Sequence, residues 1–229
     1  MSPRPLPAFL LRRGLVVSCQ ARADNPLHGA VFMGAMARAA QAGGAIAIRA
    51  NGVADIAAIR AATGLPVIGI AKRSSAGFDV EITPSMADAR SIATAGAAMI
   101  AVDATGRARD GETLADLVGG ITQELALPVM ADVATLPQGE AAAALGCAVV
   151  ATTLSGYTAD SPRLPGPDFE LLAQLVARLK VPVIAEGRFT TALEIAHAFA
   201  LGAHAVVVGT AITNPREITR RFVAAVPGP

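Results

Sequence analysis

The chain has 229 residues, of which 53% are hydrophobic and 3% aromatic, and its 19 basic and 18 acidic residues give a formal net charge of +1 at pH 7. So balanced a charge creates no general field that would attract nucleic acid or anionic lipid, and the few aromatic residues argue against a platform for stacked bases. No apolar run approaches the roughly 20 residues that cross a bilayer. The composition therefore predicts a soluble protein with a large core.

The two cysteines, Cys19 and Cys147, lie inside apolar runs rather than in a C-x-x-C motif. This placement predicts buried free thiols in a reducing compartment. The first residues, MSPRPLPAFLLRRG, lack the pattern of a secretory signal peptide. We therefore expect a cytoplasmic protein.

Eight short apolar runs follow one another along the chain, each followed by a polar residue or glycine and then by a segment with helical spacing. They cover residues 14–20, 45–51, 65–72, 97–105, 127–135, 147–155, 181–188 and 205–212. Runs that are apolar almost throughout are typical of strands buried on both faces. The pattern predicts a parallel sheet covered by helices, preceded by a helix or arm over residues 1–13.

Four of the runs follow a glycine, and these glycines recur about every 50 residues, as two β-α units per repeat would require. They are Gly44, Gly96, Gly146 and Gly202. Four such repeats give eight strands, so we predict that residues 1–229 form a single (β/α)8 TIM barrel of the phosphate-binding type. A doubly wound open sheet is the alternative, but its G-x-G-x-x-G fingerprint is missing after the first strand.

Polar side chains close almost every predicted strand, and in a barrel these strand ends meet at the mouth that holds the active site. Ionisable groups beside a core are costly unless they pair or bind a ligand, so the residues predict a site. An ion-pair network that seals the mouth is the structural alternative. The candidates are Gln20, Arg49, Lys72, Asp103, Asp132, Thr153, Ser155 and Glu186.

Lys72 and Glu186 end the third and seventh strands, which lie on opposite sides of an eight-stranded ring. A partly desolvated lysine near another cation such as Arg49 has its neutral form favoured and can act as a base. A carboxylate across the cavity can serve as the complementary acid or base. The pair predicts proton transfer at one bound carbon, and the order of the two groups stays open.

The last two strands end in EGR and VGTAI, and barrels commonly bind phosphate in the loops after these strands. We expect Gly187, Arg188, Gly209 and Thr210 to form that phosphate site. The three histidines share no ligand spacing, so we expect no metal.

Read together, these strand-end segments resemble the N-acetylmannosamine-6-phosphate 2-epimerase family of sialic acid breakdown. The motifs that carry the resemblance are SCQA, IRAN, IGIAKR, ITPS, VDAT, MAD, TTLSGYT and AEGR, spread from residue 18 to residue 188. The resemblance implies inversion at C2 between N-acetylmannosamine 6-phosphate and N-acetylglucosamine 6-phosphate without a cofactor. It also implies Lys72 and Glu186 as the proton-transfer pair, substrate binding by Gln20, Arg49 and Asp132, and a homodimer.

The segment from Ser74 to Glu81 departs from the family pattern, which has acidic and aromatic residues there. We expect the same backbone path with a different lid surface. Two other functions remain open: another phosphate-binding barrel isomerase acting on a different sugar phosphate or an early amino-acid precursor, and a non-catalytic sugar-phosphate sensor. In every case the expected partner is a small phosphorylated molecule, with no nucleic acid and no membrane.

Overall fold

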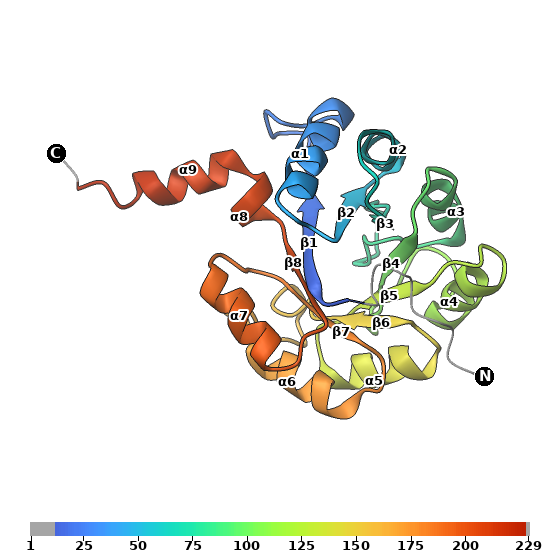
Figure 1. Cartoon of the computed structure of the whole chain (residues 1–229). Helices are drawn as coiled ribbons and strands as arrows, with labels where there is room; N and C mark the ends of the chain where they lie inside the picture. The colour runs from blue at the N-terminus through green and yellow to red at the C-terminus, as the bar shows by residue number, and fades with distance from the viewer. Residues whose placement is uncertain (1–11, 228–229) are drawn as a thin grey trace.

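The computed structural model describes residues 12–227 (Figure 1). Most of the N-terminal helix or arm expected over residues 1–13 therefore lies outside the described residues. At the start of the described part, the Arg13 guanidinium donates hydrogen bonds to the carbonyl oxygens of Phe199 and Ala203. These bonds attach the segment before the first strand to the bottom of the barrel wall.

Eight parallel strands form a closed barrel in chain order, and the first strand pairs with both the second and the eighth. The strands are β1 (Gly14–Cys19), β2 (Ala47–Asn51), β3 (Val67–Ile70), β4 (Met99–Asp103), β5 (Val129–Asp132), β6 (Val149–Ala151), β7 (Val183–Glu186) and β8 (Ala205–Val208). The prediction of a TIM barrel is confirmed, and the open-sheet alternative is wrong because β1 and β8 close the ring.

Helices follow the strands and cover the outside of the barrel (Figure 1). They are α1 (Ala30–Ala42), α2 (Val53–Ala62), α3 (Met86–Thr94), α4 (Leu114–Gln123), α5 (Leu136–Ala144), α6 (Phe169–Arg178), α7 (Ala192–Ala200), α8 (Thr210–Thr213) and α9 (Pro215–Val223). Serine, threonine or aspartate side chains cap the starts of α3, α4, α6 and α7.

The four repeating glycines lie between a helix and the next strand, as predicted. Each has a positive φ, between 92° and 101°, which places it in a backbone region that other residues avoid. The repeat in the sequence thus corresponds to four identical helix-to-strand turns.

Alternate residues of each strand point into the barrel, because side chains of a strand alternate between its two faces. The lower layers of the interior are apolar and include Val16, Ile68, Met99 and Met130. Polar residues follow at even spacing along these strands: Ser18 and Asp132 come two residues after Val16 and Met130, and Lys72 and Asp103 come four residues after Ile68 and Met99. The same alternation that fills the core with apolar side chains therefore directs polar ones toward the mouth. The interior apolar packing therefore supports the site from below.

Two further features concern the surface. Every residue of α9 is exposed or half-buried, and the helix extends away from the barrel (Figure 1). Among residues 12–227, no helix is long and apolar enough to cross a membrane.

Candidate active site

The centre of the mouth holds a buried ion-pair cluster built on Arg49, which is 1% exposed. Its guanidinium donates two hydrogen bonds to Asp132, of 3.0 Å to Oδ1 and 2.5 Å to Oδ2, and a third of 2.7 Å to Oε2 of Glu186. A buried charge is tolerated when it is paired and hydrogen-bonded. The three strands β2, β5 and β7 thus bring together three of the predicted site residues.

Burial and pairing change the acidity of this cluster. Burial raises the pKa of Glu186 to about 7, and the positive charge of Arg49 acts against that rise. Burial alone would lower the pKa of Arg49, but the negative charges of Asp132 and Glu186 outweigh burial and raise this pKa. The cluster therefore combines a permanent cation with a carboxyl group that can hold or release a proton near neutral pH.

Lys72 follows β3, on the opposite side of the ring from β7. Its backbone N–H donates a 2.7 Å hydrogen bond to Oδ1 of Asn51, and its backbone pairs with Ile82. The residue as a whole is exposed, although the surrounding residues partly shield its amine from water. Burial of the amine, and then the charge of Arg49, lower the pKa of Lys72, while Glu186 opposes this. The amine is thus within electrostatic reach of the Arg49 cluster.

Two successive threonines after β6 hold Glu186 from two sides. The hydroxyl of Thr153 lies 2.6 Å from Oδ1 of Asp132 and 3.3 Å from Oε2 of Glu186. The hydroxyl of Thr152 donates to the Glu186 carbonyl oxygen at 2.9 Å and accepts from its backbone N–H at 3.0 Å. Sequence reasoning missed Thr152 and the support that Asn51 gives Lys72, although both lie in the strand-end motifs.

The ends of β1, β7 and β8 form a second part of the mouth. Nε2 of Gln20 donates to Oγ of Ser18 at 2.8 Å. A Cβ atom added to Gly209 would lie 3.3 Å from Cβ of Ser18, and Gly187 has a φ of 116°. Thr210 begins α8. Two glycines and the start of a helix thus lie where β7 and β8 end side by side.

The structure places Asp103 apart from the Arg49 cluster. Its Oδ1 accepts hydrogen bonds from the backbone N–H and hydroxyl of Thr105, and its Oδ2 accepts one of 2.5 Å from Arg107. The carboxylate is 0% exposed. It therefore fixes the start of the β4–α4 loop and presents Arg107 at the rim.

Ser155 and Arg188 are also occupied by protein contacts. The hydroxyl of Ser155 donates to Oδ2 of Asp168 at 2.5 Å. The Arg188 guanidinium donates to the carbonyl oxygens of Gly166 and Ser155 at 2.7 and 2.5 Å, and lies 5.5 Å from the ring centre of Tyr157. Arg188 thus holds the β6–α6 loop in place.

The segment that departs from the family pattern forms a hairpin with pairs Lys72–Ile82 and Ser75–Phe78. Arg73 at its base binds Oδ2 of Asp88 at 3.2 Å and Oδ2 of Asp110 at 2.7 Å. This arginine, which sequence reasoning also missed, joins the β3–α3 loop to the β4–α4 loop.

Within residues 12–227, no group of three or more histidine, cysteine or acidic side chains is arranged to hold a metal ion. An amine with a lowered pKa, a carboxyl group with a raised pKa and a buried guanidinium that interacts with both suit removal and return of a proton next to a carbonyl group. Arg49 can stabilise the negative charge that develops on the carbonyl oxygen.

Three comparisons agree with this geometry. Residues 33–227 match the family described as "Putative N-acetylmannosamine-6-phosphate epimerase". Relatives named "Putative N-acetylmannosamine-6-phosphate 2-epimerase" from Caldanaerobacter subterraneus and Enterobacter sp. strain 638 are each 48% identical, over 93% and 95% of this chain and 91% and 94% of their own.

Among solved structures, the N-acetylmannosamine-6-phosphate 2-epimerase from Clostridium perfringens is 48% identical, with a TM-score of 0.90 over 93% of both chains. A thiamine phosphate pyrophosphorylase from Pyrococcus furiosus matches with a TM-score of 0.61 at 17% identity, over 96% of this chain and 99% of its own. At that identity the likeness shows the fold alone.

Proposed function

Because the chain belongs to the N-acetylmannosamine-6-phosphate epimerase family, we propose that it inverts C2 of N-acetylmannosamine 6-phosphate to give N-acetylglucosamine 6-phosphate. The observation that supports the proposal is that Lys72 and Glu186 lie at the ends of opposite strands, while Arg49 hydrogen-bonds Glu186 and acts electrostatically on Lys72. An epimerase needs a proton donor and an acceptor on opposite faces of one carbon, and this arrangement supplies them.

The reaction starts from the ring-opened sugar, whose aldehyde at C1 makes the C2 proton acidic. One member of the pair takes this proton, and the C2–H electrons move into an enolate whose oxygen Arg49 stabilises. The other member gives a proton to the opposite face of C2 as the carbonyl re-forms. The lowered pKa of Lys72 and the raised pKa of Glu186 let either group act in either role, which a reversible reaction requires.

We assign the sugar phosphate group to the ends of β7 and β8, where Gly187, Gly209 and Thr210 present backbone N–H groups. Arg188 shapes this site by holding the β6–α6 loop, and any direct contact of its guanidinium with phosphate stays a prediction. Support for the assignment is the absence of a Cβ atom at both glycines, which lets an anion approach the backbone.

The remaining hydroxyl and amide groups of the sugar then face the side chains around the mouth. Asp132 and Thr153 have polar atoms in contact with the Arg49 cluster, and Gln20 lies just beyond the end of β1. Asp103 and Ser155 act from further out through Arg107 and Asp168. Contact of each of these residues with the substrate is a prediction that a complex with the product would test.

We further propose that the enzyme works without metal or organic cofactor in the cytoplasm, in the breakdown of sialic acid and other amino sugars. The free thiols of the buried Cys19 and Cys147 agree with a reducing compartment.

The expected homodimer finds support in α9. Its apolar side chains Ile218, Phe222 and, just beyond its end, Val226 follow helical spacing, and Phe222 is 75% exposed. Such a stripe on a projecting helix needs a partner surface, and a second copy of the chain offers exposed Val31 and Leu193 on its own barrel. We expect Phe222→Asp to yield monomers in light scattering, whereas an unchanged dimer would exclude α9 from the interface.

The function itself is tested by following N-acetylmannosamine 6-phosphate by NMR with the purified protein and a chelator. We expect conversion to N-acetylglucosamine 6-phosphate, and a loss of at least about a thousandfold in Lys72→Met and Glu186→Gln. Lys180→Met changes an exposed lysine outside the barrel mouth and should keep full activity. Full activity in Lys72→Met, or equal turnover of a sugar phosphate without the N-acetyl group, would refute the assignment.

A further inference from the structure

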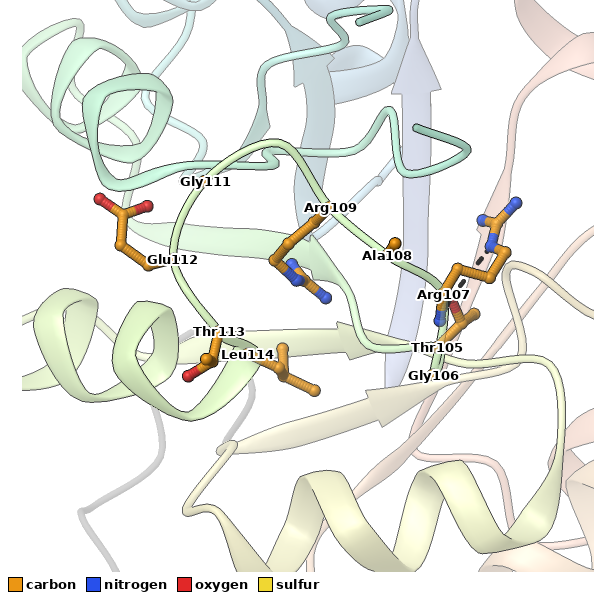
Figure 2. A pocket seen from close by; sticks show the side chains of 9 residues that line it. All are labelled: Thr105, Gly106, Arg107, Ala108, Arg109, Gly111, Glu112, Thr113 and Leu114. Carbon is orange, nitrogen blue, oxygen red and sulfur yellow. Dashed lines mark hydrogen bonds between the residues drawn. The ribbon is translucent and has the colours of Figure 1, made fainter. Parts of the chain in front are cut away.

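A cavity of about 440 Å³ lies within the β4–α4 loop (Figure 2), and no residue of the Arg49 cluster lines it. It is lined only by this loop and the start of α4, over residues 105–109 and 111–114. Arg107 and Arg109 are its two cationic residues. The proton-transfer mechanism uses neither the cavity nor Arg109.

Arg109 has hydrogen-bonding capacity that the protein leaves unused. Its Nη2 donates a 2.7 Å hydrogen bond to the carbonyl oxygen of Asp103, whereas Nη1 is buried and has no hydrogen-bond partner within residues 12–227. Burial, together with the like charge of Arg107, lowers the pKa of Arg109, although Asp103 opposes this. A buried guanidinium N–H without an acceptor is costly, and an oxyanion would supply the acceptor.

The acidic residues near the cavity are committed elsewhere. Asp103 pairs with Arg107 at 2.5 Å, and Asp110 pairs with Arg73 of the neighbouring loop. Glu112 accepts a hydrogen bond of 3.0 Å from the backbone N–H of Met86. In Figure 2 the Glu112 carboxylate points away from the curve of the loop, while the Arg109 guanidinium lies inside it. Among residues 12–227, Arg109 makes no ion pair, so its charge on the inside of the loop has no carboxylate partner.

This cavity lies on the wrong side of the barrel to serve the phosphate of the sugar. β4 stands opposite β8 in the ring of eight strands, and the proposed phosphate site lies at the ends of β7 and β8. A hexose 6-phosphate has one phosphate group, which that site already accommodates. An anion held by Arg109 is thus a separate molecule.

We propose that Arg109 and the β4–α4 loop form a second oxyanion site, which binds a free inorganic phosphate while the sugar phosphate occupies the mouth. That the anion at Arg109 and the sugar phosphate are two different molecules rests on the proposed function. The binding of an oxyanion to Arg109 does not depend on that function. Because Asp110 of the same loop binds Arg73, which directly follows Lys72, an anion here also stabilises the loop that carries the catalytic amine.

The test is equilibrium dialysis of the full chain with inorganic phosphate, which counts bound phosphate without any turnover. We expect Arg109→Gln to bind one phosphate per chain fewer than the unchanged protein. Ala108→Glu places a carboxylate in the cavity while keeping Arg109, and should lose the same phosphate. Arg90→Gln removes an exposed guanidinium on α3 and should bind as the unchanged protein does.

Equal phosphate binding by the unchanged protein, Arg109→Gln and Ala108→Glu would overturn the proposal. So would a rise of about tenfold or more in the KM for N-acetylmannosamine 6-phosphate in Arg109→Gln, since the cavity would then hold the phosphate of the substrate itself. Failure of the proposed function would give a different result. The unchanged protein would then not epimerise the sugar phosphate, but Arg109→Gln would still bind one phosphate per chain fewer than the unchanged protein.

Discussion

Replacing Arg49 with methionine removes the cation that holds two carboxylates in the barrel mouth while keeping a long unbranched side chain. Asp132, which is 0% exposed, and Glu186, whose side chain is 13% exposed, would then face each other without the guanidinium. Removing one partner of a buried ion pair costs about 3–5 kcal/mol, because the remaining charge stays buried and unpaired. We expect a loss of unfolding free energy of that size at pH 8.

The loss should shrink as the pH falls. In the unchanged protein the charge of Arg49 acts against the burial that raises the pKa of Glu186, so its removal raises that pKa further. A group whose pKa is raised on folding stabilises the folded state at low pH, and this contribution is lost as the pH rises through the folded value. The loss in the variant should therefore be smaller at pH 5 than at pH 8, while the buried Asp132 still lacks its cation at both pH values.

The measurement is urea unfolding followed by circular dichroism at pH 5 and pH 8. Arg90→Met is the matched control, since its ion pair with Glu124 is more than half exposed on both sides and should contribute only about 0–1 kcal/mol. A loss below about 1 kcal/mol for Arg49→Met at pH 8, or an equal loss at both pH values, would refute the account of the cluster.

Three further predictions concern the same mouth. Because the pKa of Glu186 is raised to about 7, the unfolding free energy of the unchanged protein should fall between pH 5 and pH 8 more than that of Glu186→Gln, and equal slopes in urea unfolding would contradict this. Thr152→Val removes the hydroxyl that fixes the Glu186 backbone, so kcat should fall about tenfold or more with KM nearly unchanged, and steady-state kinetics that show only a KM change would speak against it. Gly156→Ala adds a Cβ atom 2.5 Å from Nη1 of Arg188 at a φ of 83°, so thermal unfolding should show a loss of about 1–3 kcal/mol, and an unchanged Tm would exclude the close contact.

The barrel could be predicted because its signals are local and repeated. Continuous apolar runs mark strands buried on both faces, and Gly146 or Gly202 mark the turn that a helix makes before the next strand. The centre of the site followed from the same alternation. Arg49 and Glu186 lie an even number of residues beyond interior apolar positions, so the strand itself aims them into the mouth.

Residues beyond the strand ends were harder to place, because loop conformation decides their contacts. In the structure the carboxylate of Asp103 binds Arg107 four residues later, and its contact with the substrate stays a prediction. The guanidinium of Arg188 binds carbonyl oxygens of the β6–α6 loop, and its contact with phosphate stays a prediction as well. The pairing of Arg73 with Asp110 joins two loops whose separation in sequence gives no signal of contact.

The most direct measurement of the central claim is deuterium uptake at C2 from heavy water by each sugar phosphate epimer separately. We expect the unchanged protein to label both epimers. Lys72→Met and Glu186→Gln should each lose net interconversion of the two epimers. Each variant should also stop labelling one epimer, and the unlabelled epimer should differ between the two variants, because each group serves one face of C2. Labelling of both epimers at the normal rate by either variant would contradict a pair that works from opposite sides of the barrel.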